Sequence, residues 1–95
     1  MHEFEWDEKK ARSNLAKHGI TFEAAKIAFV DRFALELSED VAAYGEERYI
    51  LIGMVRLSLC TAVYTERNGR IRIISARHAT RAEEKLYDDN RRGRR

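Results

Sequence analysis

Residues 70–87, RIRIISARHATRAEEKLY, decide the fold, because they lead from a strand pattern directly into the start of a helix. Side chains alternate between the two faces of a strand, so Ile71, Ile73 and Ser75 share one face and the neighbouring arginines take the other. The dipeptide just before this stretch, Asn-Gly at 68–69, predicts a type I′ hairpin turn, since both central positions need positive φ. The stretch is therefore predicted to close an antiparallel meander.

The second half of the stretch predicts a capped helix. Thr80 and Glu83 form a capping box, in which the hydroxyl and the carboxylate accept hydrogen bonds from backbone N–H groups at the helix start. Arg77 and His78 then lie at the end of a strand, immediately before that helix. A rigid position of this kind is suited to cations and an imidazole that bind a phosphate, so the pattern indicates binding of a polyanion.

Upstream of the strands the sequence predicts a helical hairpin with a tight turn. Asp7 caps a first helix that ends near His18, and Gly19 supplies a left-handed stop. Thr21 caps the second helix. The residues predicted to face inward are Ala11, Leu15 and His18 in the first helix, and Phe22, Ala25, Ile27, Phe29 and Val30 in the second.

The remaining elements complete an α+β fold with a three- to four-stranded antiparallel sheet and a C-terminal helix. Residues 4–6 predict an edge strand or a clasp onto the core. The other predicted segments are strands at 33–37, 48–54, 57–65 and 70–76, an acidic loop at 38–47, and a helix from 80 to about 90 with Ala79, Ala82 and Leu86 inward. These make one domain over residues 1–90, followed by a flexible basic tail at 91–95.

Charge is distributed unevenly along the chain. Residues 31–66 carry seven acidic and three basic side chains, whereas residues 67–95 carry four acidic and ten basic ones. One surface for nucleic acid and another for a basic partner would produce this pattern, and so would an ordinary mixed solvated surface. Cys60 is the only cysteine, the start is not signal-like, and no apolar run approaches about 20 residues. We expect a soluble cytoplasmic protein that does not contact a membrane.

Three blocks of sequence resemble the BrnT family of toxins from bacterial type II toxin–antitoxin pairs. They are FEWDEKKARSNLAKHGITFEAA at 4–25, ERYILIG at 47–53 and IRIISARHATRAEEKLY at 71–87. The resemblance implies a RelE-like fold and RNA cleavage that stops translation. It also implies neutralisation by BrnA, a ribbon-helix-helix antitoxin, in a complex of two toxins and two antitoxins. DNA would be met only indirectly, through the antitoxin. His78 stands where the family more often has a basic residue.

Metal-independent RNA cleavage uses the neighbouring 2′-hydroxyl as nucleophile and needs a base, an acid and cations around the phosphate. His18 and His78 are the predicted proton-transfer groups, because the ordinary histidine pKa is about 6.5. Arg77 is the predicted phosphate ligand, since its planar fork donates two parallel hydrogen bonds. Tyr87 is predicted to stack a base or to donate to phosphate. The predicted substrate-binding residues are Arg72, Lys17 and Arg81.

Each of these residues also has a structural interpretation. His18 can interact with the helix dipole, Arg77 can form an ion pair with Glu83 or Glu84, and Tyr87 can be a core residue with a wet hydroxyl. No metal or cofactor site is predicted, because the histidines and the cysteine lack ligand spacing. The rival functions are a non-catalytic module that holds nucleic acid or the antitoxin, and a purely structural subunit.

Overall fold

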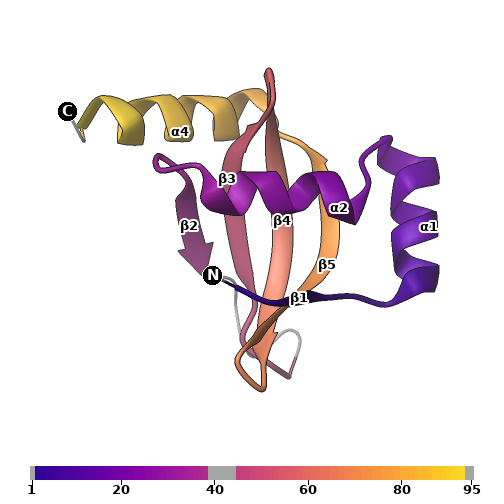
Figure 1. The fold of residues 1–95 in the computed structure, drawn as a ribbon. Coiled ribbons are helices and arrows are strands. Elements are labelled where there is room, and N and C mark those ends of the chain that lie inside the picture. Colours follow the sequence, from indigo (N-terminus) through magenta and orange to yellow (C-terminus); the bar gives the residue numbers. More distant parts are fainter. Residues whose placement is uncertain (1, 39–44, 94–95) are drawn as a thin grey trace.

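The computed structural model describes residues 2–38 and 45–93, and in them it confirms the α+β class and the C-terminal helix. A five-stranded sheet in the order β1-β5-β4-β3-β2 forms the centre (Figure 1). In chain order the elements are β1 Phe4–Glu5, α1 Glu8–His18, α2 Phe22–Ala25, η1 Lys26–Val30, β2 Leu35–Ser38, β3 Tyr49–Val55, β4 Ser58–Arg67, β5 Arg70–His78 and α4 Arg81–Gly93.

The sheet corrects the prediction of three or four antiparallel strands. Strands β2 to β5 are antiparallel neighbours, but β1 pairs with β5 in parallel, with Phe4 opposite Ile71. The N–H of Ile71 also donates to the carbonyl of Glu3 over 2.9 Å. The sequence of a two-residue strand does not indicate its direction, so this pairing of the chain start with the last strand was not predictable.

Local signals set most of the turns and helix ends as predicted. Asn68 and Gly69 have φ of 52° and 77°, which confirms the hairpin between β4 and β5. The Asp7 carboxylate accepts from two backbone N–H groups at the start of α1, and Gly19 ends that helix with a φ of 72°. Thr21 caps α2 by accepting from the N–H of Ala24 over 3.0 Å. These helix ends could therefore be predicted from the sequence, because the interactions that set them involve residues only a few positions apart.

The predicted inner faces of the N-terminal helices were partly wrong. In α1 the buried residue is Asn14, while Leu15 is 46% exposed. The second helix tightens into the 3₁₀ turns of η1, which changes the residue period, so Ala28 is buried and Val30 is 80% exposed. Ile27 is likewise exposed. Helical spacing alone did not predict either change.

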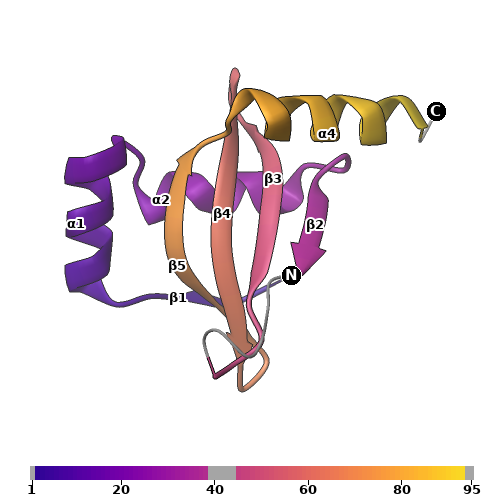
Figure 2. The ribbon, with the colours of Figure 1, turned by 180° about the vertical axis from the view of Figure 1, so that it is seen from behind.

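The α2–η1 segment crosses one face of the sheet (Figure 1), and α4 lies across one end of the strands on the opposite side (Figure 2). The core between α2–η1 and the sheet includes Phe22 and Ile73, both almost fully buried. Gly53 lies beneath η1, where a Cβ would come within 2.6 Å of the Ala28 carbonyl oxygen. Only glycine fits this close approach of helix to strand without a shift.

Helix α4 corrects the predicted inner face of the C-terminal helix. Ala82 and Leu86 are exposed, and Tyr87 is buried instead. The helix also continues to Gly93 rather than ending near Asn90. The predicted flexibility of the tail stays a prediction for residues 94–95, and the predicted acidic loop stays one for residues 39–44, because both segments lie outside the described residues.

Candidate functional site

A pocket lies between α1 and β5, and we call it the α1–β5 pocket. Its lining residues are Lys10, Ser13, Asn14, Lys17, His18, Ile74 and Ser75. Those from α1 recur at intervals of three and four residues, which places them on one face of the helix. The described lining combines two ammonium groups, an imidazole and two hydroxyls, and no carboxylate is among these described residues.

The side chain of Asn14 fixes α1 against β5 at the floor of this pocket. Its amide nitrogen donates to the carbonyl of Ala76 over 2.8 Å and to that of Ile20 over 3.0 Å. In return the N–H of Ala76 donates to the Asn14 carbonyl oxygen over 3.1 Å. Because β1 pairs with β5 only at residues 71 and 72, the amide satisfies the strand edge where no strand covers it. This holds Lys17 and His18 beside Ser75.

Two of the predicted site residues, Lys17 and His18, therefore lie together in the pocket. Both belong to the last turn of α1, where cations also interact favourably with the helix dipole. Lys17 is exposed and His18 is half-buried. Sequence reasoning missed Lys10, Ser13 and Ser75 as lining residues. The sequence signal for Lys10 was its i, i+7 spacing from Lys17, but no nearby residue indicated that β5 would lie against this face of α1.

Arg77 lies at a second place on β5, which we call the β5–α4 junction and define by Arg77, Glu83, Thr61 and Thr80. The guanidinium forms a bidentate ion pair with the Glu83 carboxylate, at 2.7 and 2.9 Å. Glu83 also accepts from the Thr61 hydroxyl and from the N–H of Thr80. The hydrogen bond from Arg77, helped by these two donors, lowers the pKa of Glu83 to about 2 despite its partial burial. The ion-pair interpretation of Arg77 is thus the one observed.

Tyr87 anchors the middle of α4 rather than facing solvent. Its side chain is 5% exposed, and its hydroxyl donates to the Asp31 carboxylate over 2.7 Å. Asp31 also accepts from the N–H groups of Phe33 and Met54. Burial, and next the hydrogen bond to Asp31, raise the pKa of Tyr87 to about 12. The hydroxyl is therefore engaged in joining α4 to the loop after η1.

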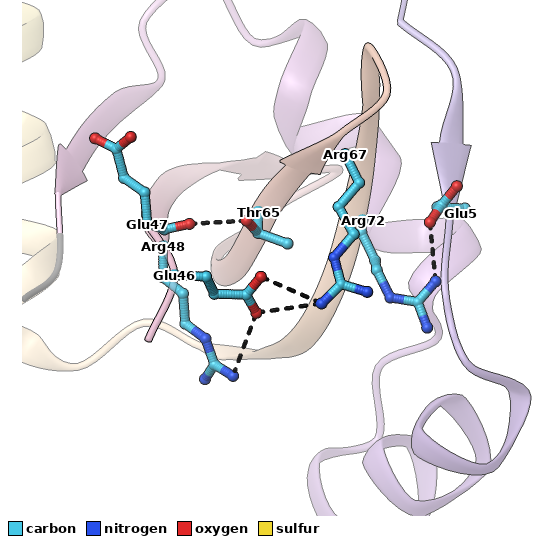
Figure 3. A network of polar contacts seen from close by, with 7 residues as sticks. All are labelled: Glu5, Glu46, Glu47, Arg48, Thr65, Arg67 and Arg72. Carbon is cyan, nitrogen blue, oxygen red and sulfur yellow. Dashed lines mark hydrogen bonds and ion pairs between the residues drawn. The ribbon is translucent and has the colours of Figure 1, made fainter. Parts of the chain in front are cut away.

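The other predicted residues lie outside the α1–β5 pocket. His78 follows Arg77 directly in β5, so the two side chains point to opposite faces of the strand, and His78 is exposed. Arg81 is exposed at the start of α4. Arg72 donates to the Glu5 carboxylate over 2.9 Å (Figure 3). The seven predicted residues thus do not form one cluster.

The far end of the sheet, shown in Figure 3, also neutralises its arginines internally. Arg67 and Arg48 both lie within 4 Å of the Glu46 carboxylate, at 3.2 and 3.9 Å. The hydroxyl of Thr65 donates to the backbone carbonyl of Glu47 over 2.7 Å, which ties β4 to the same segment. Part of the excess positive charge in the last third of the sequence is therefore neutralised by ion pairs with acidic residues from earlier in the chain.

Comparison with protein families gives one match over most of the chain. Residues 6–83 match the family described as the ribonuclease toxin, BrnT, of type II toxin–antitoxin systems. Comparison with curated proteins finds no match. Within residues 2–38 and 45–93, no group of three or more His, Cys, Asp or Glu side chains is placed to hold a metal ion. In the same residues no helix has the length and apolar character needed to cross a membrane.

Proposed function

The chain belongs to the BrnT family of ribonuclease toxins from type II toxin–antitoxin systems, and from this premise we propose that it is an endoribonuclease that cleaves RNA with its own side chains and no metal ion. The observation that carries this proposal is the α1–β5 pocket, where His18 lies with Lys10 and Lys17. An imidazole that shares a pocket with ammonium groups can supply both proton transfer and charge stabilisation at one phosphate.

The chemistry begins at the 2′-hydroxyl of the RNA. Neutral His18 takes the hydroxyl proton while the oxygen forms a bond to the adjacent phosphorus, and the bond from phosphorus to the 5′-oxygen breaks. The leaving 5′-oxygen receives a proton from solvent or from a protonated side chain, so the products are a 2′,3′-cyclic phosphate and a free 5′-hydroxyl. Lys17 neutralises the charge that gathers on the phosphate oxygens during this step.

Arg77 has a secondary place in this proposal. A phosphate would have to compete with the Glu83 carboxylate for the two guanidinium nitrogens that it already occupies at 2.7 and 2.9 Å. Arg77 does lie on the same face of β5 as Ser75, two residues along the strand, so it is close to the pocket lining. We assign the first phosphate contact to Lys17, and the anchoring of α4 to Arg77.

The cellular role follows from the family. Membership of a type II system implies an RNA target and a protein antitoxin. We propose that RNA cleavage stops translation in the bacterial cytoplasm, and that a ribbon-helix-helix antitoxin of the BrnA kind neutralises the toxin in a 2:2 complex and makes the only DNA contact. We also propose kinship with RelE-like toxins, supported by a sheet with N-terminal helices and a C-terminal helix.

The test is cleavage of an end-labelled RNA in EDTA by the purified protein and by His18→Gln. We expect the variant to lose about 10²- to 10⁴-fold in rate, because glutamine keeps hydrogen bonding but transfers no proton at neutral pH. His2→Gln is the matched control, since His2 is exposed near the chain start. A larger loss in His78→Gln would place the active site elsewhere. RNA binding by the unmodified protein without any cleavage would favour the non-catalytic module.

A further inference from the structure

We propose that Lys10 binds a second phosphate of the substrate, so that a single-stranded RNA lies along α1 with its scissile phosphate at Lys17 and His18. This inference deepens the proposed function and relies on it for the identity of the ligand. It assigns to Lys10 a role in substrate binding that the lysine-rich start of α1 does not reveal, because Lys9 beside it has the same chemistry and a different position.

The geometry of α1 supports two phosphate contacts. Lys10 and Lys17 are seven residues apart, which is about two helical turns and about 10.5 Å along the axis. Both line the same pocket, and the hydroxyl of Ser13 lies on the same face between them. Lysine carries its charge on a flexible four-carbon stem, so the two ammonium groups can adjust to the spacing of neighbouring phosphates in an extended strand.

The electrostatic setting distinguishes these lysines from the basic residues of α4. There, Lys85 pairs with Asp89 and Arg92 with Asp88, each at 3.2 Å. In the described part of the chain neither Lys10 nor Lys17 forms an ion pair, and the pocket lining holds no carboxylate. Two carboxylates lie at the start of α1: that of Asp7 accepts the backbone N–H groups of Lys9 and Lys10, and that of Glu8 accepts from the Trp6 indole N–H. The charges lining the pocket therefore remain available to an anion.

Cleavage by the 2′-hydroxyl favours a single strand over a duplex for a stereochemical reason. Attack by the 2′-hydroxyl requires it to line up opposite the leaving 5′-oxygen, and A-form stacking holds the nucleotide away from that arrangement. A flexible strand reaches it at little cost. Its phosphates can also follow the groove between the helix and the strand edge, as single-stranded RNA follows basic grooves in general.

The experiment measures the affinity for a 2′-O-methyl oligonucleotide, which keeps its phosphates but cannot be cleaved, at several salt concentrations. Each phosphate contact to a single strand contributes about 0.7 to the slope of log affinity against log salt. We expect Lys10→Gln and Lys17→Gln each to weaken binding and to reduce this slope by about 0.7. The matched control is Lys9→Gln, which removes the same charge from the same exposed turn but outside the pocket lining.

The outcomes separate this inference from the proposed function. A slope for Lys10→Gln equal to that for Lys9→Gln overturns the second phosphate contact, and cleavage that depends on His18 would still stand. Equal rates of cleavage of a natural RNA as a single strand and as a duplex overturn the single-strand preference. A Lys10-dependent slope together with no cleavage of natural RNA would support the binding inference and contradict the nuclease. Thermal unfolding of each variant excludes a loss of folding as the cause.

Discussion

The α1–β5 pocket and the β5–α4 junction lie on the same strand, yet they use positive charge in opposite ways. At the junction the Arg77 guanidinium is bound to Glu83, and the pair joins β4, β5 and α4. In the pocket, Lys10 and Lys17 lie among lining residues that, within 2–38 and 45–93, include no carboxylate. The junction therefore uses its cation to hold the fold, and the pocket cations are the ones that we propose to bind a ligand.

This difference explains why Arg77, the most prominent basic residue of the sequence motif, did not by itself indicate a phosphate site. A planar guanidinium matches a carboxylate as well as it matches a phosphate, because both accept two parallel hydrogen bonds. The capping box brings Glu83 to the start of α4, within reach of Arg77 near the end of β5. An arginine just before such a box is thus provided with an internal partner by the same residues that start the helix.

Removing the partner at the junction should give the largest effect on stability. We expect Glu83→Ala to lower the free energy of unfolding by about 3 kcal/mol, because it removes the bidentate acceptor of a half-buried guanidinium, the acceptor of the Thr61 hydroxyl and half of a capping box. Urea unfolding measures this, with Glu84→Ala as the exposed control, expected within about 0.5 kcal/mol of the unmodified protein. Unchanged stability together with tighter RNA binding would show instead that Glu83 keeps Arg77 from binding phosphate. The claim that the junction cation serves the fold alone would then be wrong.

The same contribution should depend on pH. The folded-state pKa of Glu83, about 2, lies below its ordinary value of 4.5, so ionised Glu83 stabilises the folded state. That stabilisation is complete above the unfolded-state value and is lost as the pH falls from about 4.5 to about 2. The stability difference between the protein and its Glu83→Ala variant should therefore shrink across this window.

The pocket side of the comparison is tested by Asn14→Ala. We expect a loss of about 2 kcal/mol, since the change leaves the backbone N–H and carbonyl of Ala76 and the carbonyl of Ile20 without this partner. Hydrogen exchange at the Ala76 amide should become faster by a larger factor than at other protected amides of β5. The control is Ser13→Ala, an exposed neighbour in the same pocket, expected to change stability by less than about 0.5 kcal/mol. Full protection of Ala76 in Asn14→Ala would mean that the amide does not hold α1 in place.

The smallest expected effect is that of Tyr87→Phe, which removes one hydrogen bond to Asp31. We expect about 1 kcal/mol of lost stability, because the ring stays buried and Asp31 keeps its two backbone donors. RNA cleavage per folded molecule decides between the anchoring role and the catalytic role predicted from the sequence. A fall of about 100-fold or more in cleavage would return Tyr87 to the site and extend the catalytic region to α4.

The parts of the fold that could be read from the sequence are those set by backbone chemistry within a few residues. The Asn68-Gly69 turn needs positive φ, and the caps at Asp7, Thr21 and Thr80 satisfy N–H groups two or three residues away. In each of these patterns, the residues that set the local structure lie within the pattern itself. They predicted where elements begin and end, and the structure confirms them.

The parts that could not be read depend on partners far along the chain. In the sequence Asn14 is an ordinary polar helix residue, and its role depends on Ala76, which lies opposite it in the fold. The spacing of Ala82 and Leu86 predicts a core-facing side of the helix, but in the fold Glu83 bonds Thr61 and both apolar residues are exposed. The same limit applies to the candidate site. Lys17 and His18 were predicted from the helix end, but Ser75 and the register of Lys10 became evident only with the sheet in place.

The short parallel pairing of β1 with β5 has a consequence for how the chain matures on the ribosome. Phe4 and Ile71 are neighbours in space but opposite ends of a nascent polypeptide, and the clamp between Asn14 and Ala76 spans almost the same interval. Until the last strand has left the exit tunnel, the amino-terminal helix has no surface to dock on. The α1–β5 pocket, where we propose that RNA binds, can therefore form only after β5 has emerged from the ribosome.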